Sequence, residues 1–436
     1  MKINLPKQVE FIIDKIYENG HEAFIVGGCV RDSILGIKPN DYDITTNAKP
    51  DEVIEIFKDY KIIDNGIKHG TIGLIIDKDI YEITTYRIES EYEGNRRPKD
   101  VKFTSNIIED LKRRDFTINS IAYNYKRGLI DVFDGMNDIH RKVVKTVGDP
   151  DERFNEDGLR IVRAIRFSSK LGFDIESKTL KSIYKNSYIV KEISKERITD
   201  EVNKIILSKN PQQIILLYTT GILQSLGIYC DLNGNEYNML KKYSEILVQC
   251  SENLEERLLM LEYLISNKEI TDMSNKEDEN IKYYKENIQP KSIVNKLKYS
   301  KYISNHCNKL IEYMFIDENN IDLIKIKKIL NKIGAKNLNQ VFKLKKMYYE
   351  YNLKNDSYNE SFKIKYNLLN NYINKIECIE KNKECYMIKD LDINGSILEG
   401  LGYKGIDIGN KLNYLLEEVI KNPSLNKREN LMKLLR

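Results

Sequence analysis

The sequence predicts an α+β protein, a small α/β head followed by an all-α remainder. Short apolar runs with strand alternation, separated by glycines, occupy residues 1–148. From residue 149 onward helical spacing replaces them, as in GLRIVRAIRFSSKLGF at residues 158–173. A chain of 436 residues, 41% of them hydrophobic, is long enough for two to four domains with cores of their own.

Composition excludes several classes of protein. Lys plus Arg number 70 against 66 Asp plus Glu, so any nucleic-acid site must be a local patch. The N-terminal residues do not resemble a signal peptide, and no run of eighteen apolar residues occurs. The six cysteines form no CxxC pair and the four histidines are far apart in sequence. We therefore expect a soluble cytoplasmic protein with no membrane span, no zinc site and no disulfide framework.

Arginine usage points to the first half of the chain. Of 16 arginines, 13 lie between Arg31 and Arg197, although the chain prefers lysine elsewhere. A flat and permanently charged guanidinium suits phosphates, carboxylates and base edges. The chemistry is therefore expected between these two residues.

The first predicted strand ends on a pair of glycines. AFIVGG at residues 23–28 reads as a buried strand, and a helix is expected to begin after Gly28. Such a turn directs backbone N–H groups and the positive end of a helix toward a possible phosphate, although a glycine pair also simply turns a chain.

Two carboxylates follow in DYDITT at residues 41–46, which reads as a second strand. Strand alternation places Asp41 and Asp43 on one face, where their repulsion calls for a cation, and hard oxygen ligands suit Mg²⁺. The alternative is a solvated pair at a strand edge. TIGLII at residues 71–76 and IYEITTY at residues 80–86 predict a hairpin. Within it Glu82 is either a third carboxylate of the site or a partner for a lysine on a neighbouring strand.

A basic run precedes FTINSIAYN at residues 116–124, which looks like a helix start. In one interpretation Asp115 is the N-cap and the run is solvated. In the other, Arg114 reaches a triphosphate and Asp115 keeps strand and helix in register. LIDVFDG at residues 129–135 predicts one more short strand.

The helix at residues 158–173 carries charges at every third position. They are Asp157, Arg160, Arg163 and Arg166. Taken alone, this pattern is also typical of a helix with acid–base pairs along its surface. Further on, Arg197 and Glu201 are four apart, which predicts an ion pair along one helix with a structural role.

These motifs together resemble a known family. GGCVRD, DYD and RRDFTIN, then residues 152–173, 196–207 and, more weakly, 394–412, resemble the class II tRNA nucleotidyltransferases, the bacterial CCA-adding enzymes and their poly(A) polymerase relatives. The resemblance implies a nucleotidyltransferase (polymerase β-like) α/β head at residues 1–148. It further implies a helical neck with a nucleobase-recognition helix at 149–210, a helical body at 211–300 and a helical, tRNA-binding tail at 301–436.

The resemblance also implies roles for individual residues. Asp41 and Asp43 would bind the Mg²⁺ that aligns the tRNA 3′ hydroxyl with the α-phosphate. Gly28, Arg31 and Arg114 would contact the triphosphate.

Base selection is the role implied for the neck. Cytosine and adenine each present an amine donor beside a ring-nitrogen acceptor, whereas uracil and guanine present a carbonyl beside a ring N–H. A carboxylate and a guanidinium match the first pattern, and in this family Asp157 and Arg160 would supply them. Arg163 and Arg166 would lie near the second base edge or the phosphates.

The implied activity is addition of C, C and A to tRNA from CTP and ATP. Residues 89–103 read as a mobile polar loop, and a loop here is associated in the family with the switch from C to A. The alternatives are a poly(A) polymerase, an A-only or CC-only enzyme, and an inactive RNA-binding relative. Lysine-rich helices such as residues 325–338 would hold the tRNA by its phosphates.

Overall fold

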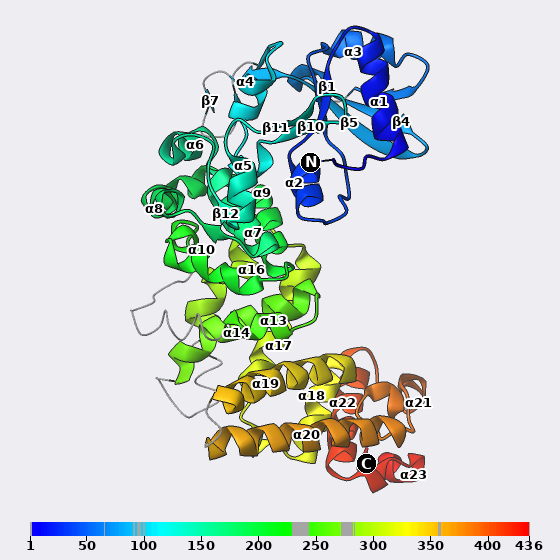
Figure 1. Ribbon diagram of the computed structural model, residues 1–436. Helices are drawn as coiled ribbons and strands as arrows, with labels where there is room; N and C mark the ends of the chain where they lie inside the picture. Colours follow the sequence, from blue (N-terminus) through cyan, green and yellow to red (C-terminus); the bar gives the residue numbers. More distant parts are fainter. Residues whose placement is uncertain are drawn as a thin grey trace. The chain divides into compact units, whose positions relative to one another are not determined.

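The computed structural model confirms the α+β class (Figure 1). It describes residues 2–64, 66–89, 92–93, 97–98, 101–228, 244–271, 282, 284–355 and 359–435. The chain forms two compact units, one of Met1–Lys241 with Lys296–Lys298 and one of Lys242–Asn295 with Tyr299–Arg436. The finer division at residues 148, 210 and 300 stays a prediction.

A mixed seven-stranded sheet forms the centre of the head. Its strand order is β11-β10-β1-β2-β5-β4-β3, and β2 and β5 are parallel whereas every other neighbouring pair is antiparallel. Because of these directions, the end of β1 and the beginnings of β2, β5 and β10 lie at one end of the sheet. Its strands are β1 (Ala23–Val26), β2 (Ile44–Thr46), β3 (Lys61–Ile63), β4 (Thr71–Ile76), β5 (Asp79–Thr85), β10 (Ala122–Asn124) and β11 (Gly128–Ile130).

Helices and short helical turns cover this sheet. The apolar positions of α1 recur at helical spacing, and Val9, Ile12, Ile13 and Ile16 are all buried. Another part of the core packs Ile107 and Leu111 of α4 against Phe24 of β1. The head contains α1 (Lys7–Glu18), α2 (Gly28–Ile34), α3 (Pro50–Ile56), α4 (Ile107–Lys112), α5 (Gly135–His140) and the 3₁₀ turns η1 (Ile67–His69) and η2 (Thr117–Asn119).

The predicted hairpin is confirmed. β4 and β5 pair from Thr71↔Thr84 to Ile76↔Asp79. Asp77 and Lys78 connect them with φ of 51° and 76°, the backbone of a tight turn whose twist matches the two strands.

Three local predictions in the head are wrong. The second strand begins only at Ile44, so residues 41–43 precede it. Residues 116–124 are not a helix start but η2 followed by β10, because Thr117 N–H donates to Lys145 O and Phe116 forms a β-bridge with Thr146. The strand predicted at residues 129–135 ends at Ile130, since Asp131 accepts hydrogen bonds from the first two N–H groups of α5.

The predicted loop at residues 89–103 is partly a β-ladder. β6 (Arg87–Glu89) pairs with β9 (Val101–Phe103), and β7 (Tyr92–Glu93) pairs with β8 (Arg97–Pro98). Residues 90–91, 94–96 and 99–100 lie outside the described residues. Because these backbones pair as strands, the described part of residues 89–103 is not a loop.

From residue 149 onward the first unit is mainly helical, as the spacing predicts. Asp149 caps α6 by accepting from the N–H groups of Asp151 and Glu152, and Pro150 begins the helix. The predicted helix at residues 158–173 is α7. Residues 143–228 contain α6 (Pro150–Glu156), α7 (Leu159–Leu171), α8 (Ser177–Asn186), η3 (Ser187–Glu192), α9 (Lys195–Ile206), η4 (Pro211–Ile214), α10 (Ile215–Thr219), α11 (Ile222–Ser225) and the parallel pair β12 (Val143–Val144) and β13 (Asp174–Ile175).

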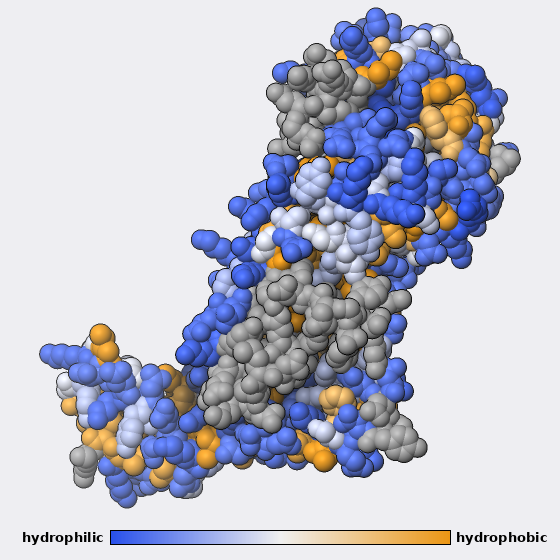
Figure 2. Space-filling view, turned by 90° about the vertical axis from the view of Figure 1, so that its left-hand side faces the viewer, coloured by the Kyte–Doolittle hydropathy of each residue, from blue (hydrophilic) through white to orange (hydrophobic). Residues whose placement is uncertain are grey.

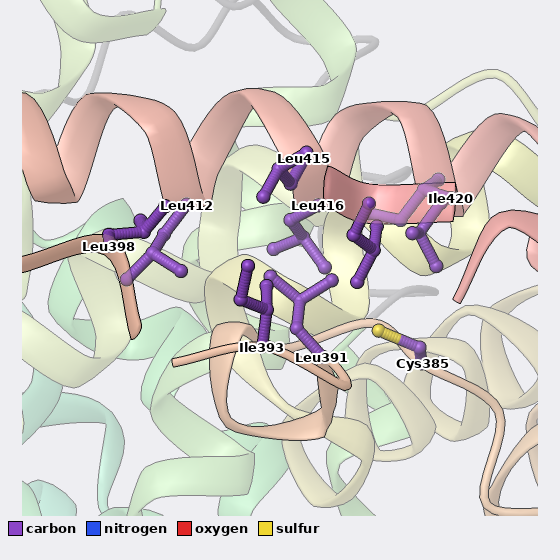
Figure 3. Close-up of a cluster of buried hydrophobic side chains, with 10 residues drawn as sticks. Cys385, Leu391, Ile393, Leu398, Leu412, Leu415, Leu416 and Ile420 are labelled. Carbon is purple, nitrogen blue, oxygen red and sulfur yellow. The ribbon is translucent and has the colours of Figure 1, made fainter. Parts of the chain in front are cut away.

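In the second unit every described element is helical. Figure 3 shows one of its cores, in which Leu412, Leu415 and Leu416 of α22 meet Leu391 and Ile393. Its elements are α13 (Ile246–Gln249), α14 (Leu254–Thr271), η5 (Tyr284–Ile288), η6 (Gln289–Lys291), α16 (Ile293–Lys296), α17 (Lys301–Met314), η7 (Glu318–Asn320), α18 (Leu323–Ile333), α19 (Ala335–Asn355), α20 (Glu360–Lys381), η8 (Ile388–Asp390), α21 (Gly395–Gly400), α22 (Ile406–Lys421), η9 (Pro423–Leu425) and α23 (Arg428–Leu434).

The surface is mainly polar on the face drawn in Figure 2, where hydrophobic residues lie in small patches between hydrophilic ones. Across the described ranges, none of the helices combines the length and the apolar character needed to span a bilayer.

Candidate active site

The turn after β1 requires glycine. Gly27 has φ of 80°, a conformation that side chains disfavour, and a Cβ there would lie 2.9 Å from Nη1 of Arg114. Gly28 begins α2 directly after it. The missing side chain of Gly27 is therefore what lets the Arg114 guanidinium lie against this turn.

Replacing Gly27 by alanine is expected to lower the nucleotide transfer that the resemblance implies by about tenfold or more, since a 1 Å misplacement already has a large effect on reacting geometry. The added methyl group pushes Arg114 away, and the backbone strain reduces stability by about 1–2 kcal/mol. Steady-state kinetics and thermal unfolding measure the two effects.

Gly20→Ala is the matched control, because Gly20 also has positive φ, at 82°, but nothing lies within 4 Å of its would-be Cβ. It should lose stability and keep its activity. Equal activity losses in both variants would contradict a specific role for the contact between Gly27 and Arg114.

Asp41 and Asp43 lie directly before β2, at the same end of the sheet as this turn. The carbonyl of Asp43 accepts from Val26 N–H at 3.0 Å, which continues the pairing of β1 with β2. The β2–β5 register pairs Ile44 with Ile83, so Glu82 lies beside Asp43 on the neighbouring strand. Both aspartates are exposed. The prediction that both aspartates belong to the strand is wrong. They precede it instead, and Asp43 is next to its first residue.

The electrostatics of Asp43 show unbalanced negative charge. Partial desolvation raises the pKa of this carboxyl, Arg114 opposes the shift, and the carboxylates of Asp41 and Glu82 raise it further. Within the described ranges, no group of three or more His, Cys, Asp or Glu side chains is arranged to hold a metal ion. A repelling pair of exposed carboxylates nevertheless has the charge and ligand chemistry that suit a divalent cation.

Arg114 carries a positive charge that its neighbours neutralise only in part. Its guanidinium is 3.6 Å from Asp110, and its buried Nε has no hydrogen-bond partner among the described residues. Burial lowers the pKa of Arg114, and the carboxylates of Asp110, Asp43 and Asp115 offset part of that effect. A partly buried cation of this kind, beside a glycine turn, favours the approach of an anion such as a phosphate.

Arg31 is engaged inside the protein. It is 2% exposed, donates from Nε to Asp32 Oδ1 at 2.8 Å and from Nη1 to Asn119 Oδ1 at 2.5 Å, and lies over the ring of Phe167. These contacts connect α2 to η2 and to α7. The contact of Arg31 with a triphosphate stays a prediction.

Asp115 ties the head to the neck. Its Oδ1 accepts from Phe116 N–H and from Asn119 Nδ2, and its Oδ2 accepts from Nε and Nη2 of Arg163 at 2.8 and 2.6 Å. Burial alone raises the pKa of Asp115, but Arg163, Asn119 and Arg160 outweigh it and lower this pKa to about 2. Asp115 therefore does not cap a helix. It joins η2 to α7.

The lowered pKa of Asp115 predicts how the stability of the folded protein depends on pH. A depressed pKa means stabilisation that is present above the usual value for aspartate and lost as pH falls through about 2. Asp115→Asn is expected to lose about 2 kcal/mol at pH 7, and the difference from the parent chain should shrink between pH 4 and pH 2.

Urea unfolding at several pH values measures this difference, with the exposed Asp174→Asn as control. A stability difference that stays constant across the pH range would show that the Asp115 charge contributes nothing.

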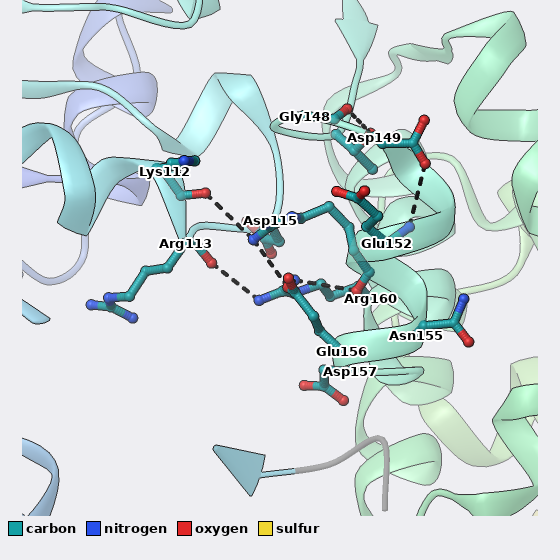
Figure 4. Close-up of polar contacts among 12 residues, drawn as sticks. Lys112, Arg113, Asp115, Gly148, Asp149, Glu152, Asn155, Glu156, Asp157 and Arg160 are labelled. Atoms are coloured by element: carbon teal, nitrogen blue, oxygen red, sulfur yellow. Dashed lines mark hydrogen bonds and ion pairs between the residues drawn. The ribbon is translucent and has the colours of Figure 1, made fainter. Parts of the chain in front are cut away.

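The charged residues that recur at every third position around α7 form separate contacts in the structure. Asp157 lies before α7 and not within it, where Oδ1 accepts from Leu159 N–H at 3.1 Å and Oδ2 from Arg197 at 3.0 Å. Arg160 is 7% exposed, and it donates to Glu156 Oε2 at 2.5 Å and to the carbonyl of Arg113 at 3.1 Å (Figure 4). The helical neighbours expected from the spacing thus bind different partners.

The predicted pair of Arg197 with Glu201 is wrong. Both residues are on α9, but Arg197 binds Asp157 and Glu201 binds Arg166 at 2.5 Å. α7 and α9 pack side by side, so buried charges of one helix meet those of the other. Spacing within one helix does not reveal such partners.

Further contributors were not foreseen. Asn119 joins Arg31 to Asp115, and the ring of Phe167 has the guanidinium groups of Arg31, Arg163 and Arg166 at 5.2, 5.4 and 3.9 Å from its centroid. In the sequence, the only indication of this arrangement is the concentration of arginines in the first half of the chain.

Two family models match the chain. The model described as Poly A polymerase head domain matches residues 23–145, and that described as Probable RNA and SrmB- binding site of polymerase A matches residues 172–227. These ranges contain the glycine turn, the aspartate pair, Arg114 and Arg197.

Relatives named CCA-adding enzyme match about half of the chain. That of Ligilactobacillus salivarius is 44% identical over 234 residues, which are 54% of this chain and 57% of the relative. That of Lactobacillus delbrueckii subsp. bulgaricus is 48% identical over 202 residues, 46% of this chain and 50% of the relative. The match thus spans about half the length of these curated relatives.

Solved structures extend the likeness to the whole fold. The Bacillus stearothermophilus CCA-adding enzyme in complex with CTP is 26% identical with a TM-score of 0.71, over 99% of this chain and 97% of that one. The Thermotoga maritima CCA-adding enzyme complexed with tRNA is 20% identical with a TM-score of 0.59, over 100% and 99%, and shows the fold alone. Two stretches of the chain, residues 23–145 and 172–227, thus match models of polymerase A domains, and about half of the chain is similar to proteins named CCA-adding enzyme.

Proposed function

We propose that this protein adds C, C and A to the 3′ end of tRNA, using CTP and ATP, by metal-dependent nucleotidyl transfer. The observation that carries the proposal is the meeting of Asp41, Asp43, Arg114 and the Gly27–Gly28 turn at one end of the sheet. Relatives named CCA-adding enzyme, matched over about half of the chain, support the choice of reaction.

Asp41 and Asp43 are proposed to hold Mg²⁺. Their exposed, mutually repelling carboxylates fit this role, since a cation relieves the repulsion that raises the pKa of Asp43. When bound, the ion supplies positive charge to the reacting α-phosphate and lowers the pKa of the attacking 3′ hydroxyl.

The remaining head residues are proposed to position the triphosphate. Arg114 offers a partly neutralised guanidinium beside the turn, and Gly28 leaves room for phosphates to approach the backbone. Arg31 holds α2 against η2 through Asn119, so its effect on the triphosphate includes the placing of Gly28. Positioning and electrostatics are the main requirements of phosphoryl chemistry.

The neck is proposed to choose the base. Asp157 accepts from the exocyclic amine of C or A, and Arg160 donates to the adjacent ring nitrogen. Arg197 orients the Asp157 carboxylate, and Glu156 orients the Arg160 guanidinium. Arg163 and Arg166 support this position through Asp115 and Glu201. Asp157 and Arg160 bind different partners in the structure. Both can contact one base edge only if nucleotide binding replaces some of these contacts.

The tRNA is proposed to bind through phosphates, in the cytoplasm where it is processed. Lys327, within the lysine-rich run at residues 325–338, is excluded from this role because it is 1% exposed and paired with Glu384 at 2.8 Å. Lys325, Lys328, Lys332 and Lys336 of that run are intermediate or exposed. Binding that stays constant as salt is raised would contradict a grip on phosphates.

Product sequencing tests the proposal. Purified protein receives tRNAs that end before CCA, in C or in CC, together with Mg²⁺ and CTP, ATP or both. We expect growth to stop at CCA, with CTP alone extending only to CC. A product with a longer A tail would identify a poly(A) polymerase, and addition of A alone or of CC alone would identify the restricted enzymes. Absence of any incorporation would leave an RNA-binding relative.

A further inference from the structure

The second unit contains a pocket of about 330 Å³ whose lining includes Lys336 of the lysine-rich run but no other residue that has been given a role above. It is formed by residues before and at the start of α14, by the first two turns of α17 and by the first half of α19 (Figure 1). Its lining combines two aromatic rings, side-chain amides, two lysines and the carboxylates of Glu255 and Glu256. This combination suits a nucleotide, which presents a flat base, polar base edges and a phosphate in one molecule.

Tyr302 supplies a flat surface at the mouth of the pocket. It is 66% exposed, and its ring is stacked on that of His306, with 5.8 Å between centroids and 9° between planes. His306 is in turn 3.7 Å from Glu255, which holds the lower ring of the stack. An exposed aromatic ring with a fixed orientation is the platform on which RNA-binding proteins stack a base.

Asn339 supplies an acceptor that lacks a donor. Its Oδ1 is buried and has no hydrogen-bond partner among the described residues. A buried oxygen without a partner is costly, by about 1–3 kcal/mol, so its presence in a pocket wall points to a ligand that donates. The exocyclic amine of a base is such a donor.

Lys336 and Lys343 supply positive charge. They are seven residues apart on α19, two turns of helix, and therefore lie on one side of it. Both are exposed, and neither forms an ion pair with a residue that the structure describes. Two such charges beside an aromatic platform suit the phosphate of a nucleotide.

We propose that this pocket binds one nucleotide, with the base on Tyr302, an amine on Asn339 and the phosphate near Lys336 and Lys343. The nucleotide is either a residue of bound RNA or a free ribonucleotide, since both have this chemistry. The site does not depend on the transfer reaction proposed for the first unit.

The absence of tryptophan from the chain allows a direct test. Tyr302→Trp preserves a stacking surface and introduces into the pocket the chain's only tryptophan, whose emission can be excited selectively over that of the tyrosines. Tyr414→Trp is the control, because Tyr414 is also exposed, at 43%, but belongs to α22 and not to the pocket. tRNA lacking CCA, ATP and CTP are titrated separately, and gel shift records tRNA binding independently.

We expect tRNA to quench the emission of Tyr302→Trp and not that of Tyr414→Trp, which identifies an RNA residue as the ligand. Quenching by ATP or CTP identifies a free nucleotide. In the RNA case Tyr302→Ala should weaken tRNA binding about tenfold, and Tyr414→Ala should not. Unchanged emission of Tyr302→Trp with every probe, while gel shift shows bound tRNA, or equal quenching of both reporters, would overturn the proposal. Because no step requires transfer, a catalytically inactive protein gives the same answer.

Discussion

Asp43→Asn is expected to abolish nucleotide transfer, with kcat reduced by about 10³-fold or more, while the protein stays folded. The substitution preserves shape but removes one of the two charges proposed to hold Mg²⁺. Transition-state charge stabilisation of this kind is typically the largest single contribution to catalysis. Incorporation of labelled CTP into tRNA, with Mg²⁺ varied, measures the loss.

Asp43→Asn is expected to keep or gain stability although it loses activity. The pKa of Asp43 is raised by desolvation and by the neighbouring carboxylates, so its ionised form is unfavourable in the folded protein. That cost is present above the raised pKa and disappears as pH falls through it. Without metal, Asp43→Asn should therefore unfold at the same temperature as the parent chain or a higher one at pH 7.

The exposed Asp59→Asn is the matched control and should leave transfer unchanged. If Asp43→Asn retained full turnover, the assignment of the aspartate pair to the reaction would be wrong. If it lost both turnover and stability, Asp43 would be structural and not catalytic.

The candidate site was predictable where the chemistry lies in short segments. A strand followed by two glycines and a helix needs only local patterns, and Asp41 and Asp43 are two residues apart. The sheet order is not local. The antiparallel pairing of β2 with β1 and its parallel pairing with β5 bring Glu82 beside Asp43, and no pattern within either strand specifies these partners.

Other errors have the same origin. The apolar positions Phe116, Ile118 and Ile121 are compatible with a helix, but contacts with residues 145 and 146 impose an extended segment and a 3₁₀ turn. The spacing of Arg197 and Glu201 allows an intrahelical pair, which contributes only about 0.3–0.5 kcal/mol. Arg197 instead contacts Asp157, and Glu201 contacts Arg166. These partly desolvated contacts are stronger, and only tertiary packing brings the partners together.

Asp157→Asn is expected to lower the preference for CTP and ATP over UTP and GTP by about 10- to 100-fold, the discrimination that one base-edge hydrogen-bond pattern provides. An asparagine can direct its amide N–H₂ toward the carbonyl of U or G, where the carboxylate repels it. Its oxygen can still accept from Leu159 N–H or Arg197, so the start of α7 should stay folded. Ratios of kcat/KM for the four nucleotides measure the change.

Asp151→Asn is the control for this variant, because Asp151 belongs to α6, the helix that precedes Asp157, but binds Lys185, away from Asp157. It should leave nucleotide preference unchanged. Arg197→Ala should change preference less than Asp157→Asn, because it removes only the group that orients the carboxylate. If Asp157→Asn kept the preference of the parent chain, recognition of the base edge would have to come from other residues. A fall in kcat/KM that is equal for all four nucleotides would instead show that Asp157 stabilises the corner between α6 and α7 and has no part in reading the base.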